Sequence, residues 1–114
     1  MKRPNLILSI FLAVGILYSC SKNDDNDPVG ETPGPKFLAV KSVVTGNCAT
    51  SGCHASPSNT GGLNFETNAG IVANGSRIKQ QAVDQGTMPP TGALSATDKA
   101  KISDWISAGG RLTD

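Results

Sequence analysis

The stretch Cys48-Ala49-Thr50-Ser51-Gly52-Cys53-His54 holds the side chains that decide how this chain is organised. His54 is the single histidine of the chain, and it directly follows a cysteine. The chain has three cysteines, and two of them fall in this stretch. Thiols and imidazole are favoured ligands of transition metals. We therefore expect the chemistry of the protein, and the group around which it folds, to lie here.

The composition of the chain also indicates that something besides side chains stabilises the fold. The chain has 114 residues, of which 38% are hydrophobic. After residue 20, the aromatic residues are Phe37, Phe65 and Trp105. Because so small a domain buries little apolar surface, we expect a disulfide, a metal or a bulky cofactor to stabilise it. The net charge of +1 excludes a strongly basic nucleic-acid-binding protein, so we expect no nucleic-acid partner.

The first residues are typical of an export signal. Lys2 and Arg3 precede an apolar run over residues 6–18, which is short for a membrane span. The run ends at Leu17-Tyr18-Ser19-Cys20, which resembles a bacterial lipobox. We expect residues 1–19 to be a lipoprotein signal peptide and Cys20 to be lipidated. A plain signal peptide with a coincidental cysteine, or a short uncleaved anchor, is the alternative.

Residues 20–35 are acidic and rich in proline and glycine, which predicts a tether without a core of its own. Acyl chains on Cys20 would hold the protein on a bilayer. The acidic cluster resembles surface-export signals of some Gram-negative lipoproteins, and a solvated spacer explains it equally well. We expect an exported protein, lipid-anchored at the periplasmic or cell-surface face of a Gram-negative bacterium. The remaining residues, 36–114, form the single predicted domain.

The spacing of the two cysteines allows three interpretations. C-x-x-C-H is the attachment signal of c-type haem, in which both thiols bind the haem and the histidine ligates its iron. Here four residues separate Cys48 from Cys53, and Gly52 permits the longer loop. A Cys48–Cys53 disulfide is an alternative for an exported protein. Zinc is another, although only Cys48, Cys53 and His54 are at hand for the four ligands of a structural site.

Met88 strengthens the haem interpretation. It is the only methionine after the signal peptide, and it lies in Gly86-Thr87-Met88-Pro89-Pro90. The two prolines keep this segment out of helical geometry, which favours a loop that presents a thioether. An imidazole and a thioether together raise the potential of a cytochrome. We expect Met88 to be the second axial ligand of the haem iron, with a packing role as the alternative.

These residues resemble small class I cytochrome c domains, of the single-haem type found in exported bacterial proteins. The matching segments are Cys48–His54, Gly62-Leu63-Asn64-Phe65, Met88-Pro89-Pro90 and residues 94–109, which end in Trp105-Ile106-Ser107-Ala108-Gly109. The resemblance covers nearly all of the predicted domain, and the four-residue cysteine spacing departs from it. It implies one covalent haem c and one-electron transfer with redox protein partners, without a small-molecule substrate. The protein would be an electron carrier and not an enzyme.

The remaining pattern predicts an all-α fold of about four short helices wrapped around the haem. Residues 36–46, 66–73, 76–85 and a segment that Ser95 caps have helical spacing. Gly46 is expected to end the first helix and Ser76 to cap the third. Arg77 is a candidate contact for a haem propionate, or else a solvated surface residue. Trp105 is a candidate for packing in the core or against the haem, with donation of its indole N–H to a haem propionate as the alternative.

Two other functions remain open at the level of sequence. One is a haem protein whose sixth ligand is displaceable, and which binds gases or acts on peroxide. The other is an extracytoplasmic lipoprotein module without haem, stabilised by a Cys48–Cys53 disulfide. Detection of haem would distinguish a cytochrome from the disulfide-stabilised module. Rapid binding of carbon monoxide would distinguish a haem protein with a displaceable sixth ligand from an electron carrier.

Overall fold

The computed structural model describes residues 30–114, so the predicted signal peptide, Cys20 and most of the predicted tether lie outside the described residues. This part of the chain is helical and has no β-strand, as the sequence predicts. Its elements are α1 (Pro35–Asn47), the 3-10 helix η1 (Thr60–Gly62), α2 (Asn68–Ala73), α3 (Gly75–Ile78), the π-helix η2 (Lys79–Asp84) and α4 (Ala96–Ala108). Within residues 30–114, none of the helices combines the length and hydrophobicity that a membrane crossing requires.

Helix α1 buries the apolar face that the sequence predicts. Its buried side chains are Phe37, Val40, Val43 and Val44. The helix begins with a proline, which suits the first helical position because its missing N–H would have no partner there. The prediction that Gly46 ends the helix is wrong. The helix runs one residue further, and Cys48 is the C-cap, whose N–H donates to the Val44 carbonyl over 2.8 Å.

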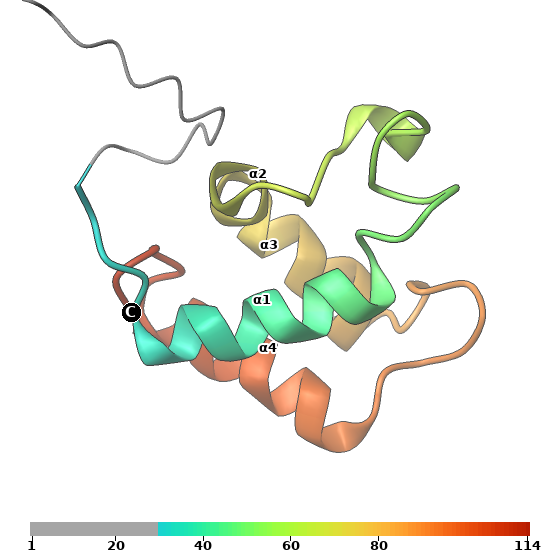
Figure 1. Ribbon diagram of the computed structural model, residues 1–114. Helices are drawn as coiled ribbons and strands as arrows, with labels where there is room; N and C mark the ends of the chain where they lie inside the picture. The colour runs from blue at the N-terminus through green and yellow to red at the C-terminus, as the bar shows by residue number, and fades with distance from the viewer. Residues whose placement is uncertain (1–29) are drawn as a thin grey trace, which may run out of the picture.

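The C-terminal residues cap the start of α1. Gly34, the N-cap, offers no side chain, so the first helical N–H groups need other acceptors. The backbone N–H groups of Lys36 and Phe37 both donate to the main-chain oxygen of Asp114, each over 3.0 Å. The N–H of Gly34 donates to the carbonyl of Leu112 over 2.8 Å. Residues 30–35 therefore enter the domain beside residue 114 (Figure 1).

Helix α4 has the boundaries that its sequence predicts. The Ser95 hydroxyl accepts a hydrogen bond from the Asp98 N–H over 3.1 Å, which caps the first turn. The helix ends where Gly109 and Gly110 take positive φ angles of 131° and 68°. Glycine tolerates this region best because it has no Cβ.

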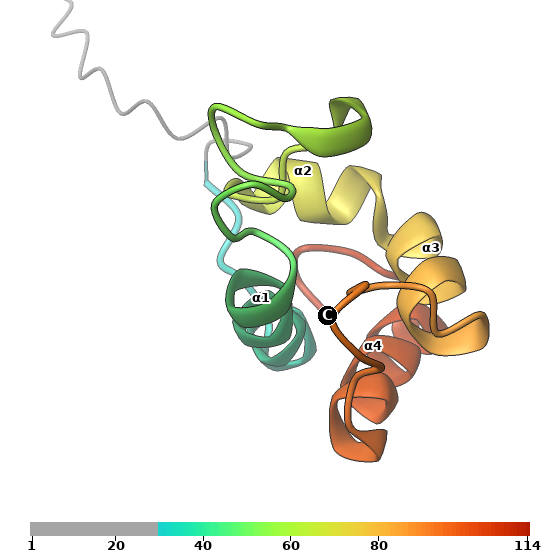
Figure 2. The same cartoon turned by 90° about the vertical axis from the view of Figure 1, so that its right-hand side faces the viewer.

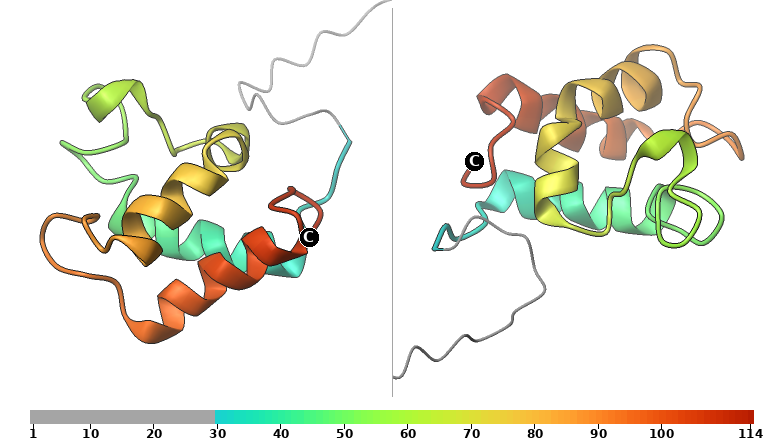
Figure 3. Two further views of the ribbon diagram at one scale, coloured as in Figure 1. Left: turned by 180° about the vertical axis from the view of Figure 1, so that it is seen from behind. Right: turned by 90° about the horizontal axis from the view of Figure 1, so that it is seen from above.

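Helices α1 and α4 pack against each other at an angle and form the core of the domain (Figure 1, Figure 3). Phe37 and Trp105 are both fully buried, and their rings meet edge to face with centroids 5.8 Å apart. Ile102 on α4 and Ile71 on α2 are also fully buried. Burying each of these side chains contributes about 1.5–3 kcal/mol.

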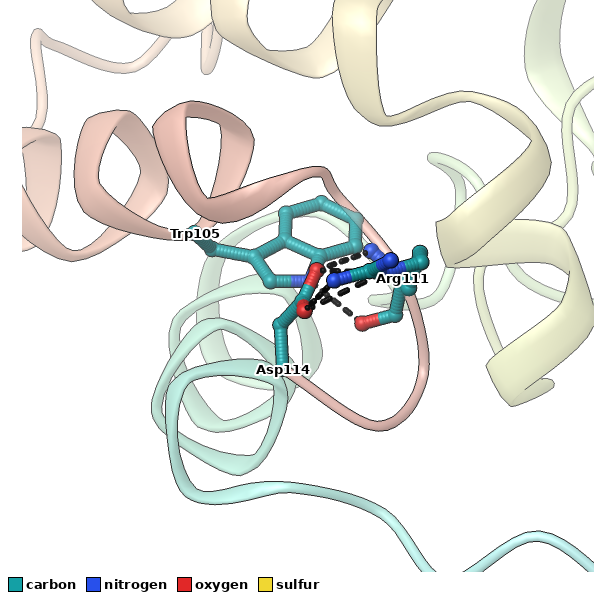
Figure 4. A network of polar contacts seen from close by, with 3 residues as sticks. All are labelled: Trp105, Arg111 and Asp114. Atoms are coloured by element: carbon teal, nitrogen blue, oxygen red, sulfur yellow. Dashed lines mark hydrogen bonds and ion pairs between the residues drawn. The ribbon is translucent and has the colours of Figure 1, made fainter.

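The indole of Trp105 also fastens the end of the chain. Its Nε1–H donates to the carbonyl of Arg111 over 2.8 Å (Figure 4). The Arg111 guanidinium pairs with the Asp114 carboxylate over 2.7 Å, and the Arg111 N–H donates to the same carboxylate. This ion pair lowers the pKa of Asp114, mainly through the guanidinium and then through the Arg111 N–H.

The middle of the chain differs in detail from its prediction. A helix over 66–73 is found, but it begins later, at Asn68, because the Thr67 side chain caps it by accepting from Gly70 N–H over 3.0 Å. Ser76 is not an N-cap, because it lies within α3. Where the sequence predicts one helix over 76–85, the chain forms a short α-helix that continues into the π-helix η2.

Candidate functional site

The loop that follows α1 folds back on itself and brings both cysteines to one place. The His54 N–H donates to the Cys48 carbonyl over 3.1 Å, and the Cys53 N–H donates to Thr50 over 3.0 Å. Gly52 has a φ angle of 82°, which an L-residue with a side chain adopts only under strain. This glycine accommodates the extra length of a four-residue spacing.

Both thiols are free. Cys48 is buried and Cys53 is half-buried, and no disulfide joins them. Burial raises the pKa of the Cys48 thiol, and the nearby Cys53 raises it further. Both effects disfavour the thiolate form of Cys48, and Cys53 lies close enough for the two groups to interact.

The His54 ring lies against Phe65, with ring centroids 4.8 Å apart. The Phe65 N–H donates to the His54 carbonyl over 2.8 Å, which ties the cysteine loop to the segment before α2. The Nδ1 atom of His54 is buried and has no hydrogen-bond partner among residues 30–114. A buried polar nitrogen without a partner costs about 1–3 kcal/mol, and a metal ion or a hydrogen-bond partner beside the imidazole would remove that cost.

Met88 is carried by a loop that the π-helix holds in place. The Gln81 carbonyl accepts from the N–H groups of Thr87, over 2.9 Å, and of Met88, over 3.2 Å. The Thr87 hydroxyl lies 2.8 Å from the Gln81 side-chain oxygen and 3.2 Å from its carbonyl. The regular pattern of an α-helix would direct the Gln81 carbonyl to the N–H of residue 85. That N–H donates to Gln80 instead, so the wide π turn releases the Gln81 carbonyl for the loop.

The two segments meet at one cavity of about 360 Å³, a volume in the range of small-molecule and cofactor sites. Cys48, Cys53 and His54 line it from the cysteine loop, and Met88, Pro89 and Pro90 line it from the methionine loop. The residues that line the rest of it include Leu63, Phe65, Arg77, Ile78, Gln81 and Ala82. Both loops lie at the end of the molecule away from residue 114, as opposite views show (Figure 1, Figure 3).

The candidate residues do not all reach this cavity. Arg77 is exposed and lines it, and among residues 30–114 it forms no ion pair. Trp105 does not line it, because the indole lies in the α1–α4 core and gives its N–H to Arg111. A second cavity, of about 380 Å³, lies between Glu31, α2 and residues 111–113, and neither a thiol nor an imidazole lines it. Cys20 lies outside the described residues.

Gln81 is the residue of this site that the sequence did not reveal. Glutamine is common on helix surfaces, and nothing in its neighbours predicts a π turn. The one available signal was Thr87, which stands next to the only methionine of the domain and whose hydroxyl needs a hydrogen-bond partner.

The residues at the cavity fit a covalently attached haem. Two free thiols, an imidazole with an unpartnered buried nitrogen and a thioether line the same space, and apolar side chains complete its wall. Among residues 30–114, no three His, Cys, Asp or Glu side chains are grouped to bind a bare metal ion. Comparisons with models of known protein families, with curated proteins and with solved structures found no match to this chain.

Proposed function

We propose that this protein is a membrane-tethered monohaem c-type cytochrome, which carries single electrons between redox partners outside the cytoplasm. The observation that carries the proposal is the meeting of Cys48, Cys53, His54 and Met88 at one cavity. Met88 is far from the other three in the sequence, and only the fold brings it to them. A packing role alone would not require Met88 to line the cavity that the two thiols and the only histidine share.

Each residue has a defined task in this proposal. Cys48 and Cys53 would hold the haem by thioether bonds, and His54 and Met88 would bind its iron. Haem c supplies a centre that accepts and releases one electron. If His54 and Met88 both bound the iron, they would leave no coordination position for a substrate, which is why we propose a carrier and not an enzyme. Arg77 lines the cavity, and its guanidinium would pair with a propionate.

The wall of the cavity contributes by excluding water. Phe65, Ile78 and Ala82 line the cavity and are buried. An apolar, water-poor surrounding is one of the means by which a protein sets a redox potential. The Gln81 carbonyl accepts hydrogen bonds from the backbone of Thr87 and Met88. The position of the Met88 backbone is therefore fixed independently of how its side chain packs.

A haem protein with a displaceable sixth ligand is the second candidate, because 37% of the Met88 surface is exposed. An exposed thioether is open to competition from an external ligand. Rapid binding of carbon monoxide by the reduced protein at neutral pH would favour this second function over an electron carrier. For the disulfide-stabilised module, the structure offers no support, since both cysteines are free.

A pyridine haemochrome spectrum of the purified protein tests the proposal. The full chain is produced in a host with a cytochrome c maturation system, and the intact mass is measured in parallel. We expect one haem per chain, retained after denaturation. Cys48→Ser and Cys53→Ser should each abolish one thioether bond, and Ser51→Ala is the matched control within the loop. A wild-type protein with no Soret absorbance would refute the proposal.

The proposed anchor has a separate test. Cys20→Ala should move the protein from the membrane fraction to the soluble fraction without loss of haem. Unchanged fractionation of this variant would remove lipidation from the proposal and leave the haem chemistry untouched.

A further inference from the structure

The cavity opens at an end of the molecule that carries almost no charge. Residues 42–65 contain no Asp, Glu, Lys or Arg, and neither do residues 85–97. The first run holds the cysteine loop and η1, and the second holds the methionine loop. The two runs are separate in the sequence, and the fold places them around one cavity. Figure 2 looks onto this end of the molecule.

Within these runs we name the exposed residues of 51–62 and 87–93 the uncharged rim; they are Ser51, Gly52, Ser56, Pro57, Ser58, Thr60, Gly61, Gly62, Thr87, Met88, Pro90, Thr91, Gly92 and Ala93. Charged residues that border the rim include Glu66, Arg77 and Lys99. Glu66 accepts from the Ser56 N–H over 3.0 Å, Arg77 lines the cavity, and the Lys99 ammonium lies beside Gly86. These neighbours include both signs, and the rim itself has no charged side chain.

A surface without charged side chains favours a partner surface that is also uncharged. A charged group of a partner that docked here would lose water and gain no opposite charge, which is costly. The rim therefore fits a face that is itself uncharged. Two copies of one chain usually meet through the same patch on each, so any charge on the patch would oppose its own copy. An uncharged rim is free of that repulsion, and the net charge of +1 adds little to it at long range.

The position of the rim in the molecule leaves it accessible. Residues 30–34 join the domain beside residue 114, at the end away from both loops (Figure 1, Figure 3). The proposed membrane tether therefore attaches away from the rim, and a second copy reaches it without passing the chain entry.

We infer that the uncharged rim is the surface through which two copies of this chain meet briefly and exchange an electron. The inference rests on the proposed function. In each encounter the reduced copy loses one electron and the oxidised copy gains it, so no other reactant is needed and no bond forms or breaks. Copies held on one membrane would in this way pass electrons among themselves.

The electron self-exchange rate of the haem-loaded full chain tests the inference. It is measured by NMR line broadening in mixtures of oxidised and reduced protein, at about 0.01 M and about 0.15 M ionic strength, where the screening length falls from about 30 to about 8 Å. We expect the wild-type rate to differ less than about twofold between the two conditions. A tenfold salt dependence of the wild type would overturn the inference.

Charges placed on the rim should change this behaviour. Ser58 and Thr91 are exposed, and neither side chain is seen to form a hydrogen bond. In Ser58→Lys/Thr91→Lys, two doubly charged faces about 10 Å apart would repel each other, which slows exchange about tenfold at low salt and about twofold at 0.15 M. The control, Leu38→Lys/Ser107→Lys, adds the same charge at exposed positions near the other end of the molecule and should leave the rate within about twofold.

A mixture of oppositely charged variants completes the test. Exchange between the Ser58→Lys/Thr91→Lys protein and a Ser58→Glu/Thr91→Glu protein should be faster at low salt than exchange within either variant. If rim and control variants behave alike, another surface is used and the inference is wrong. Haem content is measured first, because a chain without haem refutes the proposed function, whereas a haem-loaded chain that ignores rim charge refutes only this inference.

Discussion

The hydroxyl of Thr87 offers a sharp test of how the methionine loop is held. A hydroxyl has one proton, and its shorter contact is 2.8 Å to the Gln81 side-chain oxygen. Thr87→Val removes this hydrogen bond and keeps the shape of the side chain. The two backbone hydrogen bonds from Thr87 and Met88 to the Gln81 carbonyl remain, so the loop is weakened and not lost.

The expected size follows from the exposure of the contact. A neutral hydrogen bond contributes about 0.5–1.5 kcal/mol, and an exposed one such as this belongs to the lower half of that range. A loss of about 0.5–1 kcal/mol favours displacement of Met88 by about two- to fivefold. In the oxidised haem-loaded protein, imidazole competes for the position that we propose for Met88. Its apparent affinity should therefore rise two- to fivefold in the variant, as measured by absorbance titration.

Two further variants decide whether the hydroxyl is responsible. Thr87→Ser keeps a donor and should bind imidazole like the wild type. Thr91→Val removes an exposed hydroxyl from the same loop that is seen to form no hydrogen bond, and it should also have no effect. The reasoning is refuted if Thr87→Val binds imidazole with wild-type affinity, or if Thr87→Ser changes the affinity as much as Thr87→Val.

Four other outcomes are expected. Met88→Ala should retain covalent haem and lower the reduction potential, because a thioether ligand raises it; an unchanged potential in protein-film voltammetry would show that Met88 is not a ligand. Ser95→Ala should lower the free energy of unfolding by about 1 kcal/mol in urea titration, since it removes the cap of α4, and a change below about 0.3 kcal/mol would contradict the capping role. Gly75→Ala should destabilise the protein by about 1–3 kcal/mol, because the new methyl group would lie 2.9 Å from the Trp105 ring; wild-type stability would mean that α3 shifts freely on α4. The pairing that lowers the pKa of Asp114 stabilises the fold at pH values above the ordinary aspartate pKa of about 3.9, and this contribution is lost as the pH falls below that value. In Asp114→Asn, thermal unfolding curves should therefore lack the corresponding part of the acid dependence.

The outer helices could be predicted from the sequence because local signals define them. Phe37, Val40 and Val44 recur at helical spacing, and the structure buries all three. Ser95 and the Gly109-Gly110 pair mark the ends of α4 through hydrogen bonds that reach only a few residues. Such signals act within one turn of a helix, so they do not depend on the rest of the fold.

The middle of the chain could not be predicted to the same detail. The change from α3 to the π-helix has no sequence signal, and it is stabilised by bonds from the Gln81 carbonyl to a later loop. Gly46 carries a common stop signal, yet α1 continues for one more residue because the turn at Cys48 supplies the next hydrogen bond. In both places a contact outside the element decides where it ends.

The sequence also raised the expectation that side chains alone would not fill the centre of so small a domain. Trp105 and Phe37 pack against each other between α1 and α4, and neither of them lines the cavity. The space that a cofactor would fill is therefore the cavity that Cys48 and His54 line. That the haem occupies this place stays a prediction.

By itself, the sequence determined which residues can do chemistry here: one histidine, two neighbouring cysteines and one methionine in a proline-stiffened segment. It determined the two terminal helices and the two uncharged runs as well, because composition and short-range periodicity are visible along the chain. Only the tertiary structure decided that Met88 lies at the same cavity as Cys48 and His54, that Trp105 lies elsewhere, and that the uncharged runs form one rim. Each of these placements concerns residues that are far apart in the sequence. The packing of α1 on α4 and the turn at Gln81 set where those residues lie relative to one another.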